Sequence, residues 1–250
     1  MTLSNEQHNS EIQQNLQYWN NKPILRKIYH HFYTIIAAQL TDKNESDIVE
    51  LGSGIGNLKS VIPQAICTDL FANPWIDQVE NAYKLSFKDN SLSNIIMFDV
   101  FHHIGYPGDV LQEMHRTLKS GGRLIIFEPG MSLLGFLVYG LFHHEPVKRF
   151  SKINWNRPQH IAISDLGYYA AQGNASRIFR NQKYLNLLSE NWNLVTVKRF
   201  SEISYVLSGG YSKKQMFPDR FFPFLTKIDK ALDYFPALFA TRILIVLDKK

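Results

Sequence analysis

Short apolar runs recur along the first half of the chain, and each is followed by a polar or glycine-containing segment. Runs of about four to eight apolar residues bounded by turn residues are typical of buried parallel strands. By this criterion, we expect strands at 48–51, 65–68, 94–98 and 123–127, with a shorter one at 78–80. Their alternation with polar or helical segments predicts an α/β fold, in which helices cover both faces of a parallel sheet.

Further elements follow from the same patterns. Residues 11–19 can form a short helix, and apolar positions at helical spacing predict a second helix over 23–40, with proline in its first turn. Residues 107–118 and 176–189 are also predicted to be helical, and the glycines that follow the first of these are typical of a helix end. Two more strands are expected, at 192–200 and 242–247.

One segment, residues 132–142, is apolar nearly all round. It is too short to span a bilayer, which takes about 20 residues. It can be a core helix, a lid over an apolar ligand, or a helix lying at a membrane surface. The last has the least support, because the segment lacks a strongly cationic face. Residues 217–239 are rich in aromatic side chains and contain three prolines.

The composition narrows the class of protein. The chain has 250 residues, 45% of them hydrophobic, which is enough for one sizeable core. The net charge is +5 without a long basic run, so nucleic-acid binding is disfavoured, whereas an anionic substrate or peripheral membrane contact stays open. The single Cys67 excludes an internal disulfide, and the polar N-terminal residues show no signal sequence. We therefore expect a cytoplasmic protein.

Candidate chemistry begins at residues 48–57, which read IVELGSGIGN. A strand, a glycine turn and a helix-compatible segment let a ligand contact backbone amides at the edge of a parallel sheet. A dinucleotide site of the G-x-G-x-x-G type would need glycine at position 57, where this chain has Asn57. Asp69 ends the second strand, where a carboxylate can accept both hydrogen bonds of a ribose diol.

Three motifs carry a resemblance to a known family. They are VELGSGIGN from Val49, KLSFKDNSLSNIIMFDVFHHI from Lys84 and MHRTLKSGGRLIIFEP from Met114. Together they resemble class I S-adenosylmethionine-dependent methyltransferases of the small-molecule type, related to the UbiE-like or type 11 group. The resemblance implies a Rossmann-like sheet of seven strands, six of them parallel and the last, at 242–247, antiparallel.

The resemblance also implies an organisation for the whole chain. It predicts a helical cap at 1–46, an S-adenosylmethionine-binding core at 47–129 and an acceptor-side insertion at 130–190. Residues 191–250 would then complete the same domain. The implied cofactor is S-adenosylmethionine, and the residues expected to contact it are Glu50, Gly52, Ser53, Gly54, Asp69, Leu70, Asn81, Ala82 and Asp99.

The chain departs from the family pattern in places. Asn81 stands where the family often has an acid at the adenine site, and Ser86 replaces a usual proline. An amide can still meet the adenine amino group, so the cofactor prediction stands. The sequence FANPWID at 71–77 is unlike the helix that commonly follows the second strand. Because NPW does not follow the fourth strand, amino-group DNA methyltransferases are disfavoured.

The methyl acceptor is less determined. The aromatic content and the apolar 132–142 segment favour a small apolar or sugar-bearing acceptor, methylated on oxygen or carbon. An oxygen acceptor needs a base, for which His102 and His144 are the candidates, while a carbon or amine acceptor can react without one. No metal site is predicted, because neighbours such as His143 and His144 on a helix point about 100° apart.

Two alternative functions stay open from the sequence, and so does the oligomeric state. The first is a module that binds S-adenosylmethionine without catalysis. The second, less favoured, is an NAD-dependent oxidoreductase. Titration with both nucleotides distinguishes them.

Overall fold

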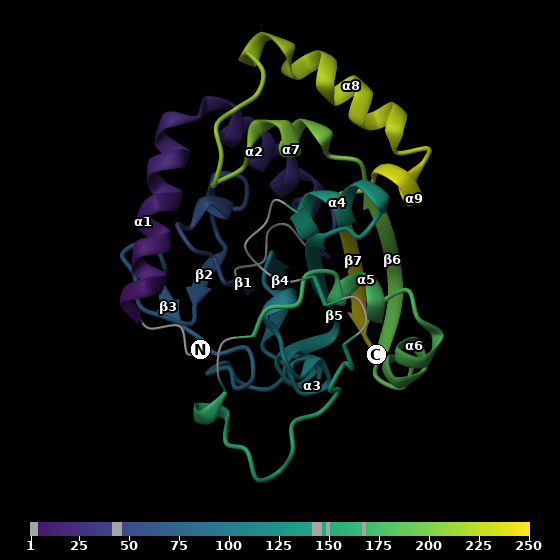
Figure 1. Ribbon diagram of the computed structural model, residues 1–250. Coiled ribbons are helices and arrows are strands. Elements are labelled where there is room, and N and C mark those ends of the chain that lie inside the picture. The colour runs from purple at the N-terminus through teal and green to yellow at the C-terminus, as the bar shows by residue number, and fades with distance from the viewer. Residues whose placement is uncertain (1–4, 42–46, 142–146, 149–150, 167–168) are drawn as a thin grey trace.

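A seven-stranded sheet forms the centre of the molecule (Figure 1). The computed structural model describes residues 5–41, 47–141, 147–148, 151–166 and 169–250. Within them the strand order is β3-β2-β1-β4-β5-β7-β6. The strands are β1 Ile48–Leu51, β2 Ile66–Asp69, β3 Gln78–Val79, β4 Leu92–Phe98, β5 Leu118–Pro129, β6 Trp192–Phe200 and β7 Arg242–Lys249.

Strand directions confirm the predicted fold class. β1 to β5 are parallel to one another, whereas β7 is antiparallel to both of its neighbours, β5 and β6. β6 therefore runs in the same direction as β1 to β5, so six strands share one direction. The chain runs outward from β1 through β2 to β3 and then returns to β4 on the other side of β1. In such sheets ligands bind where the strand order reverses, at the carboxyl ends of the strands.

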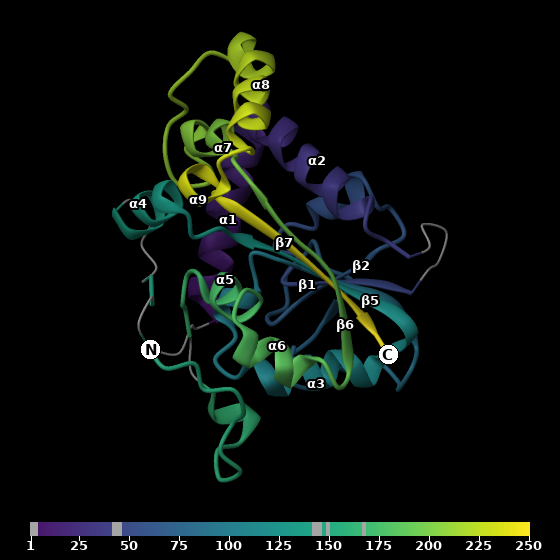
Figure 2. The same ribbon diagram turned by 90° about the vertical axis from the view of Figure 1, so that its right-hand side faces the viewer.

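Helices cover both faces of the sheet, as Figure 2 shows. α3, α5 and α6 pack on one face, and α2 and α7 pack on the other. The helices are α1 Asn5–Asn21, α2 Pro23–Ala37, α3 Pro107–Thr117, α4 Leu133–Leu141, α5 Asn174–Ile178, α6 Gln182–Leu188, α7 Ile203–Ser208, α8 Phe222–Leu232 and α9 Pro236–Phe239. Short 3-10 turns lie at Asn57–Ser60, Phe101–His103, Ile163–Asp165 and Asp219–Phe221.

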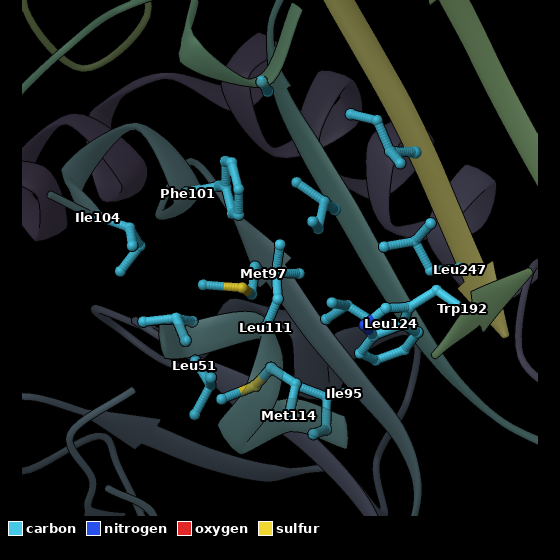
Figure 3. Packing of buried hydrophobic residues seen from close by; sticks show 14 of the residues in the cluster. Leu51, Ile95, Met97, Phe101, Ile104, Leu111, Met114, Leu124, Trp192 and Leu247 are labelled. Atoms are coloured by element: carbon cyan, nitrogen blue, oxygen red, sulfur yellow. The ribbon is translucent and has the colours of Figure 1, made fainter. Parts of the chain in front are cut away.

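Two hydrophobic clusters, one on each face, hold the helices to the sheet. Successive side chains of a strand point to opposite faces, so Ile95 and Met97 belong to the cluster under α3, while Ile96 and Phe98 belong to the cluster under α2. Figure 3 shows the first cluster, with Met97 of the central strand facing Leu111 of α3. Every residue of β4 is buried, which is why the parallel strands read as continuous apolar runs.

Some boundaries differ from those expected. β5 begins at Leu118 rather than 123, because Leu118 pairs with Leu92 before a register shift. The helix expected over 176–189 is divided into α5 and α6, since Asn181 is extended and its side chain accepts a hydrogen bond from the Lys183 amide, which starts α6. The segment after β1 forms only a short 3-10 turn.

The apolar segment near residue 132 forms α4, which is not a core helix. It buries Gly135 and Tyr139, while Leu137 and Leu141 are exposed to solvent. The Tyr139 hydroxyl donates to the Thr241 carbonyl at 3.0 Å and so fixes α4 beside the start of β7. Across the described residues, no helix has both the length and the apolar character needed to cross a membrane.

Candidate cofactor and acceptor site

The turn after β1 is built by three glycines in the left-handed region. Gly52, Gly54 and Gly56 have φ values of 70°, 55° and 66°, which side-chain-bearing residues rarely adopt. A Cβ on Gly52 would lie 2.3 Å from a methyl carbon of Val100, and one on Gly56 would lie 2.6 Å from the Trp75 carbonyl oxygen. A Cβ on Gly54 would meet no atom within 4 Å. The middle of the turn therefore presents backbone to open space, as close approach of a ligand requires.

Asp69, at the end of β2, is joined to this turn. One oxygen of its carboxylate accepts from the Gly54 amide at 3.0 Å, and the other accepts from the Leu70 amide at 2.7 Å. Ser53 connects the same two strand ends, since its amide donates to the Thr68 carbonyl at 2.8 Å. Asp69 is buried, and burial raises the pKa of its carboxyl. The carboxylate keeps lone pairs that can accept ribose hydroxyls.

α1 lies against the Asp69 side of the site. The His8 Nε2 atom is 3.5 Å from an Asp69 oxygen, and the His8 ring centre is 5.1 Å from that of Phe71. The coulombic effect of His8 lowers the pKa of Asp69 and so opposes the effect of burial. α1 therefore contacts Asp69, a residue predicted to bind the cofactor.

Glu50 lies beneath the glycine turn, inside β1. It is 3% exposed, and the Cys67 thiol of β2 donates to its Oε2 atom at 3.7 Å. Desolvation raises the pKa of Glu50 from its ordinary value of 4.5 to about 7, while hydrogen bonds from Ser53 and Cys67 oppose that rise. No ion pair joins Glu50 to a basic side chain within the described part of the chain, so this buried carboxylate is suited to receive the ammonium group of a ligand.

Asn81 and Ala82 lie in the turn after β3, which pairs with β2 at Asp69. The Asn81 side-chain oxygen accepts from the Tyr83 amide at 2.9 Å and so closes the turn. Ala82 packs against the cluster under α3. The Asn81 oxygen thus stabilises the turn. The side-chain NH2 of Asn81 is therefore the group that we predict to face an edge of the adenine.

Asp99 follows β4 and has a φ of 56°, unusual for a residue with a side chain. Its carboxylate accepts a hydrogen bond from the guanidinium of Arg242, the first residue of β7. Arg242 is 1% exposed, and its guanidinium carbon lies 4.5 Å from the ring centre of Tyr205 and 5.3 Å from that of Phe32. Burial raises the pKa of Asp99, and the charge of Arg242 opposes that rise.

His102 forms a buried pair with Glu128, the acid at the end of β5. His102 Nδ1 lies 2.7 Å from Glu128 Oε2, and the other Glu128 oxygen accepts from the Phe101 amide at 2.6 Å. The charges of both residues affect the pKa of Asp99, so the three groups lie near one another. A carboxylate at Nδ1 favours the tautomer in which Nε2 can accept a proton. His144, the other predicted base, lies outside the described residues.

Comparisons with known proteins relate this site to methyltransferases. Residues 49–126 match the model of a family described as a methyltransferase domain. These residues form a methyltransferase domain. The prediction of a class I S-adenosylmethionine-dependent methyltransferase is thereby confirmed, as are enzyme status and the methyl donor. No curated protein matches the chain in sequence.

Solved structures share the fold of the methyltransferase. Geranyl diphosphate C-methyltransferase from Streptomyces coelicolor A3(2) is 13% identical, with a TM-score of 0.53 over 90% of this chain and 80% of that one. A possible histamine N-methyltransferase from Thermotoga maritima is 14% identical, with a TM-score of 0.53 over 96% of this chain and 99% of that one.

The structure brings most of the predicted site residues of the methyltransferase to one edge of the sheet. Those from Glu50 to Leu70 surround the ends of β1 and β2, and Asp99 and His102 follow β4. Sequence reasoning missed Glu128, Arg242 and His8. Only Glu128 carries a local signal, since it ends an apolar strand in the same way as Asp69. Among the described residues, no group of three potential ligand side chains is arranged to hold a metal ion.

The pKa of Glu50 leads to a prediction about stability. Between pH 4.5 and 7 the folded state binds more protons here than the unfolded state, so this group's contribution to stability falls as pH rises. Glu50→Gln is therefore expected to raise the free energy of unfolding of the ligand-free protein above pH 7, by up to about 3 kcal/mol. It should have little effect near pH 4.5. Urea unfolding at both pH values measures the difference.

The same variant should bind S-adenosylmethionine more weakly, because glutamine carries no charge to pair with the ammonium group. Glu190→Gln, at an exposed position, is the control and should change neither quantity. A Glu50→Gln variant that is less stable at pH 8 than the wild type would contradict the effect of burial.

Proposed function

We propose that the protein binds S-adenosylmethionine across the carboxyl ends of β1, β2 and β4, and methylates a small apolar or sugar-bearing molecule on oxygen or carbon. The observation that carries the proposal is the hydrogen bond between Gly54 and Asp69. It joins a glycine turn with open backbone to a carboxylate at the point where the strand order reverses. Glu50 would receive the ammonium group, and Asn81 and Ala82 would meet the adenine.

S-adenosylmethionine supplies a methyl group on a positively charged sulfur. The residues of the chain have to orient that group toward the acceptor and exclude water, and positioning of this kind can supply about 7–11 kcal/mol. For an oxygen acceptor, we propose that His102 Nε2 accepts the hydroxyl proton as the new bond forms. Glu128, at Nδ1, would stabilise the resulting imidazolium.

Two observations support an apolar acceptor. α4 follows β5 directly, beside the carboxyl edge of the sheet, and exposes several leucines there. The Streptomyces coelicolor protein of the same fold acts on geranyl diphosphate, which has an apolar chain. We further propose that the protein works in the cytoplasm, where the buried thiol of Cys67 would stay reduced.

Asp69→Asn is expected to weaken binding of S-adenosylmethionine about 10- to 100-fold, because a hydrogen bond to a charged group contributes about 1.5–3 kcal/mol. Isothermal titration calorimetry of the purified protein measures the change. Asp89→Asn is the matched control, since the Asp89 side chain is 70% exposed and pairs with Arg116 at the surface. Equal affinity of wild type and Asp69→Asn would remove Asp69 from the ribose site.

The test of the function is incubation with methyl-labelled S-adenosylmethionine and fractionated cell extract, followed by identification of the labelled product. We expect label in a small molecule, and much less label when the Asp69→Asn variant is used with S-adenosylmethionine at a concentration near the wild-type dissociation constant. Binding without transfer to any fraction would favour a non-catalytic role. Tighter binding of NAD than of S-adenosylmethionine would contradict the proposal.

A further inference from the structure

Large apolar side chains gather on the outer side of three short helices. α8 lies at one end of the molecule in both views, and α9, which follows α8 in the chain, packs against α4 (Figures 1 and 2). We call their outer side the α4–α8–α9 surface. Its most exposed apolar residues, each at least 45% exposed, include Leu137, Leu141, Phe224, Tyr234, Phe235 and Leu238. Exposed large apolar side chains that gather on neighbouring helices are typical of a binding surface.

The acidic side chains in and just after α8 face the protein, whereas the lysines of α8 are exposed. Asp229 is buried and accepts from the Ile203 amide at 2.7 Å, and Asp233 accepts from the Ser201 amide at 2.7 Å. Both acids therefore face the protein and hold α8 on the start of α7. Lys227 and Lys230 are exposed. The outer side of α8 is consequently cationic, although α8 and the Asp233 residue that follows it contain two acids and two bases together.

The residues that flank α8 continue this pattern. Arg220 is exposed just before the helix, and the Asp219 carboxylate next to it accepts a hydrogen bond from the Gln215 side chain at 2.7 Å. Phenylalanine and tyrosine beside lysine are the side chains that occupy the boundary between headgroups and acyl chains, because their rings are apolar and the lysine amine reaches the phosphates.

We propose that the α4–α8–α9 surface docks on an anionic membrane. Phe224, Tyr234 and Phe235 would enter the headgroup boundary, and Lys227 and Lys230 would pair with lipid phosphates. Charge complementarity selects this occupant: the helix turns its acids inward and its bases outward, as a negative lipid surface requires. From sequence alone α4 lacked the cationic face of an interfacial helix, and the fold supplies that face from α8, more than 80 residues away.

The position of this surface connects it to the site. The Gly135 backbone of α4 packs against Gly130, and a Cβ there would overlap the Gly130 carbonyl oxygen. Gly130 in turn donates its amide to the Thr241 carbonyl at 2.8 Å, one residue before Arg242 and its partner Asp99. Docking would thus bring the acceptor side of the sheet close to the bilayer. The docking proposal itself stands on the surface residues and does not depend on which molecule is methylated.

Sedimentation with lipid vesicles tests the proposal. The full chain is mixed with vesicles of phosphatidylcholine alone or of phosphatidylcholine with phosphatidylglycerol, at low and at physiological salt. We expect binding to the anionic vesicles and much weaker binding to the neutral ones. Each lysine near an anionic surface contributes about fivefold in affinity, so Lys227→Glu/Lys230→Glu should lower binding at least about tenfold. Phe224→Ser/Phe235→Ser should lower it at both salt concentrations.

Controls come from α6, which lies at the other end of the molecule from α8 (Figure 1). Lys183→Glu and Leu187→Ser change exposed residues of the same types there and should leave binding unchanged. Circular dichroism confirms that each variant is folded. The proposal is overturned if the wild type does not sediment with anionic vesicles, or if the α6 variants lose as much binding. It is also overturned if the Phe224→Ser/Phe235→Ser change instead abolishes a dimer formed without lipid.

Discussion

Replacing Arg242 by methionine is expected to lower the free energy of unfolding by about 1.5–3 kcal/mol, because the half-buried Asp99 carboxylate then loses its charged hydrogen-bond partner. Methionine occupies a similar volume, but the Asp99 carboxylate then loses its cation in a place where burial already raises its pKa. The rings of Phe32 and Tyr205 also lose the charge that lies over them.

Urea unfolding at neutral pH measures this loss, and the chain offers a matched control. Arg123 of β5 and Asp248 of β7 form another arginine–aspartate pair, with 2.6 Å between the Arg123 Nε atom and an Asp248 oxygen. The Arg123 side chain is 20% exposed, whereas that of Arg242 is 1% exposed, so Arg123→Met should cost about 1 kcal/mol or less. Combining Arg242→Met with Asp99→Asn should recover part of the stability, because an amide needs no cation. Equal losses in the Arg242 and Arg123 variants would contradict the stabilising role of the buried Arg242 guanidinium.

Most of the fold could be predicted from local patterns. The strands of this sheet are buried on both faces, so each appears in the sequence as an apolar run, and the positions of β1, β4 and β6 were recognised within about two residues. The start of β5 was not, because residues 118–122 become a strand only through pairing with Leu92. Such pairing depends on residues distant in sequence and leaves no periodic signal.

The residues of the candidate site likewise include some that the sequence indicated and some that it did not. Gly54 and Asp69 were recognised because a motif and a strand end indicate each of them, and their hydrogen bond brings together the two parts of the predicted nucleotide site. Arg242 and Asp99 are 143 residues apart, and an arginine at the start of an apolar strand looks like an ordinary exposed strand end. Only the packing of α2, β4, β5 and α7 around it shows that Arg242 is buried among aromatic rings.

His102→Asn is expected to lower kcat about 100- to 10,000-fold for an oxygen acceptor, the range that general base catalysis supplies. Asparagine can still donate a hydrogen bond to Glu128 but cannot take up a proton. The KM for S-adenosylmethionine should change little, because all the predicted cofactor-binding residues except Asp99 lie on β1 and β2 or in the segments that follow β1, β2 and β3. Glu128→Gln should lower kcat in the same direction but less, since it removes only the carboxylate that stabilises the imidazolium.

Methyl transfer to the identified acceptor, measured at saturating concentrations of both substrates, separates kcat from KM. His103→Asn is the matched control. His103 is the next residue along the chain, and its Nδ1 atom lies 3.1 Å from the Tyr169 carbonyl oxygen, so its loss should change kcat only a few-fold. If His102→Asn and His103→Asn are equally active, the acceptor reacts without this base. The buried His102–Glu128 pair would then stabilise the loop after β4 by its hydrogen bonds alone.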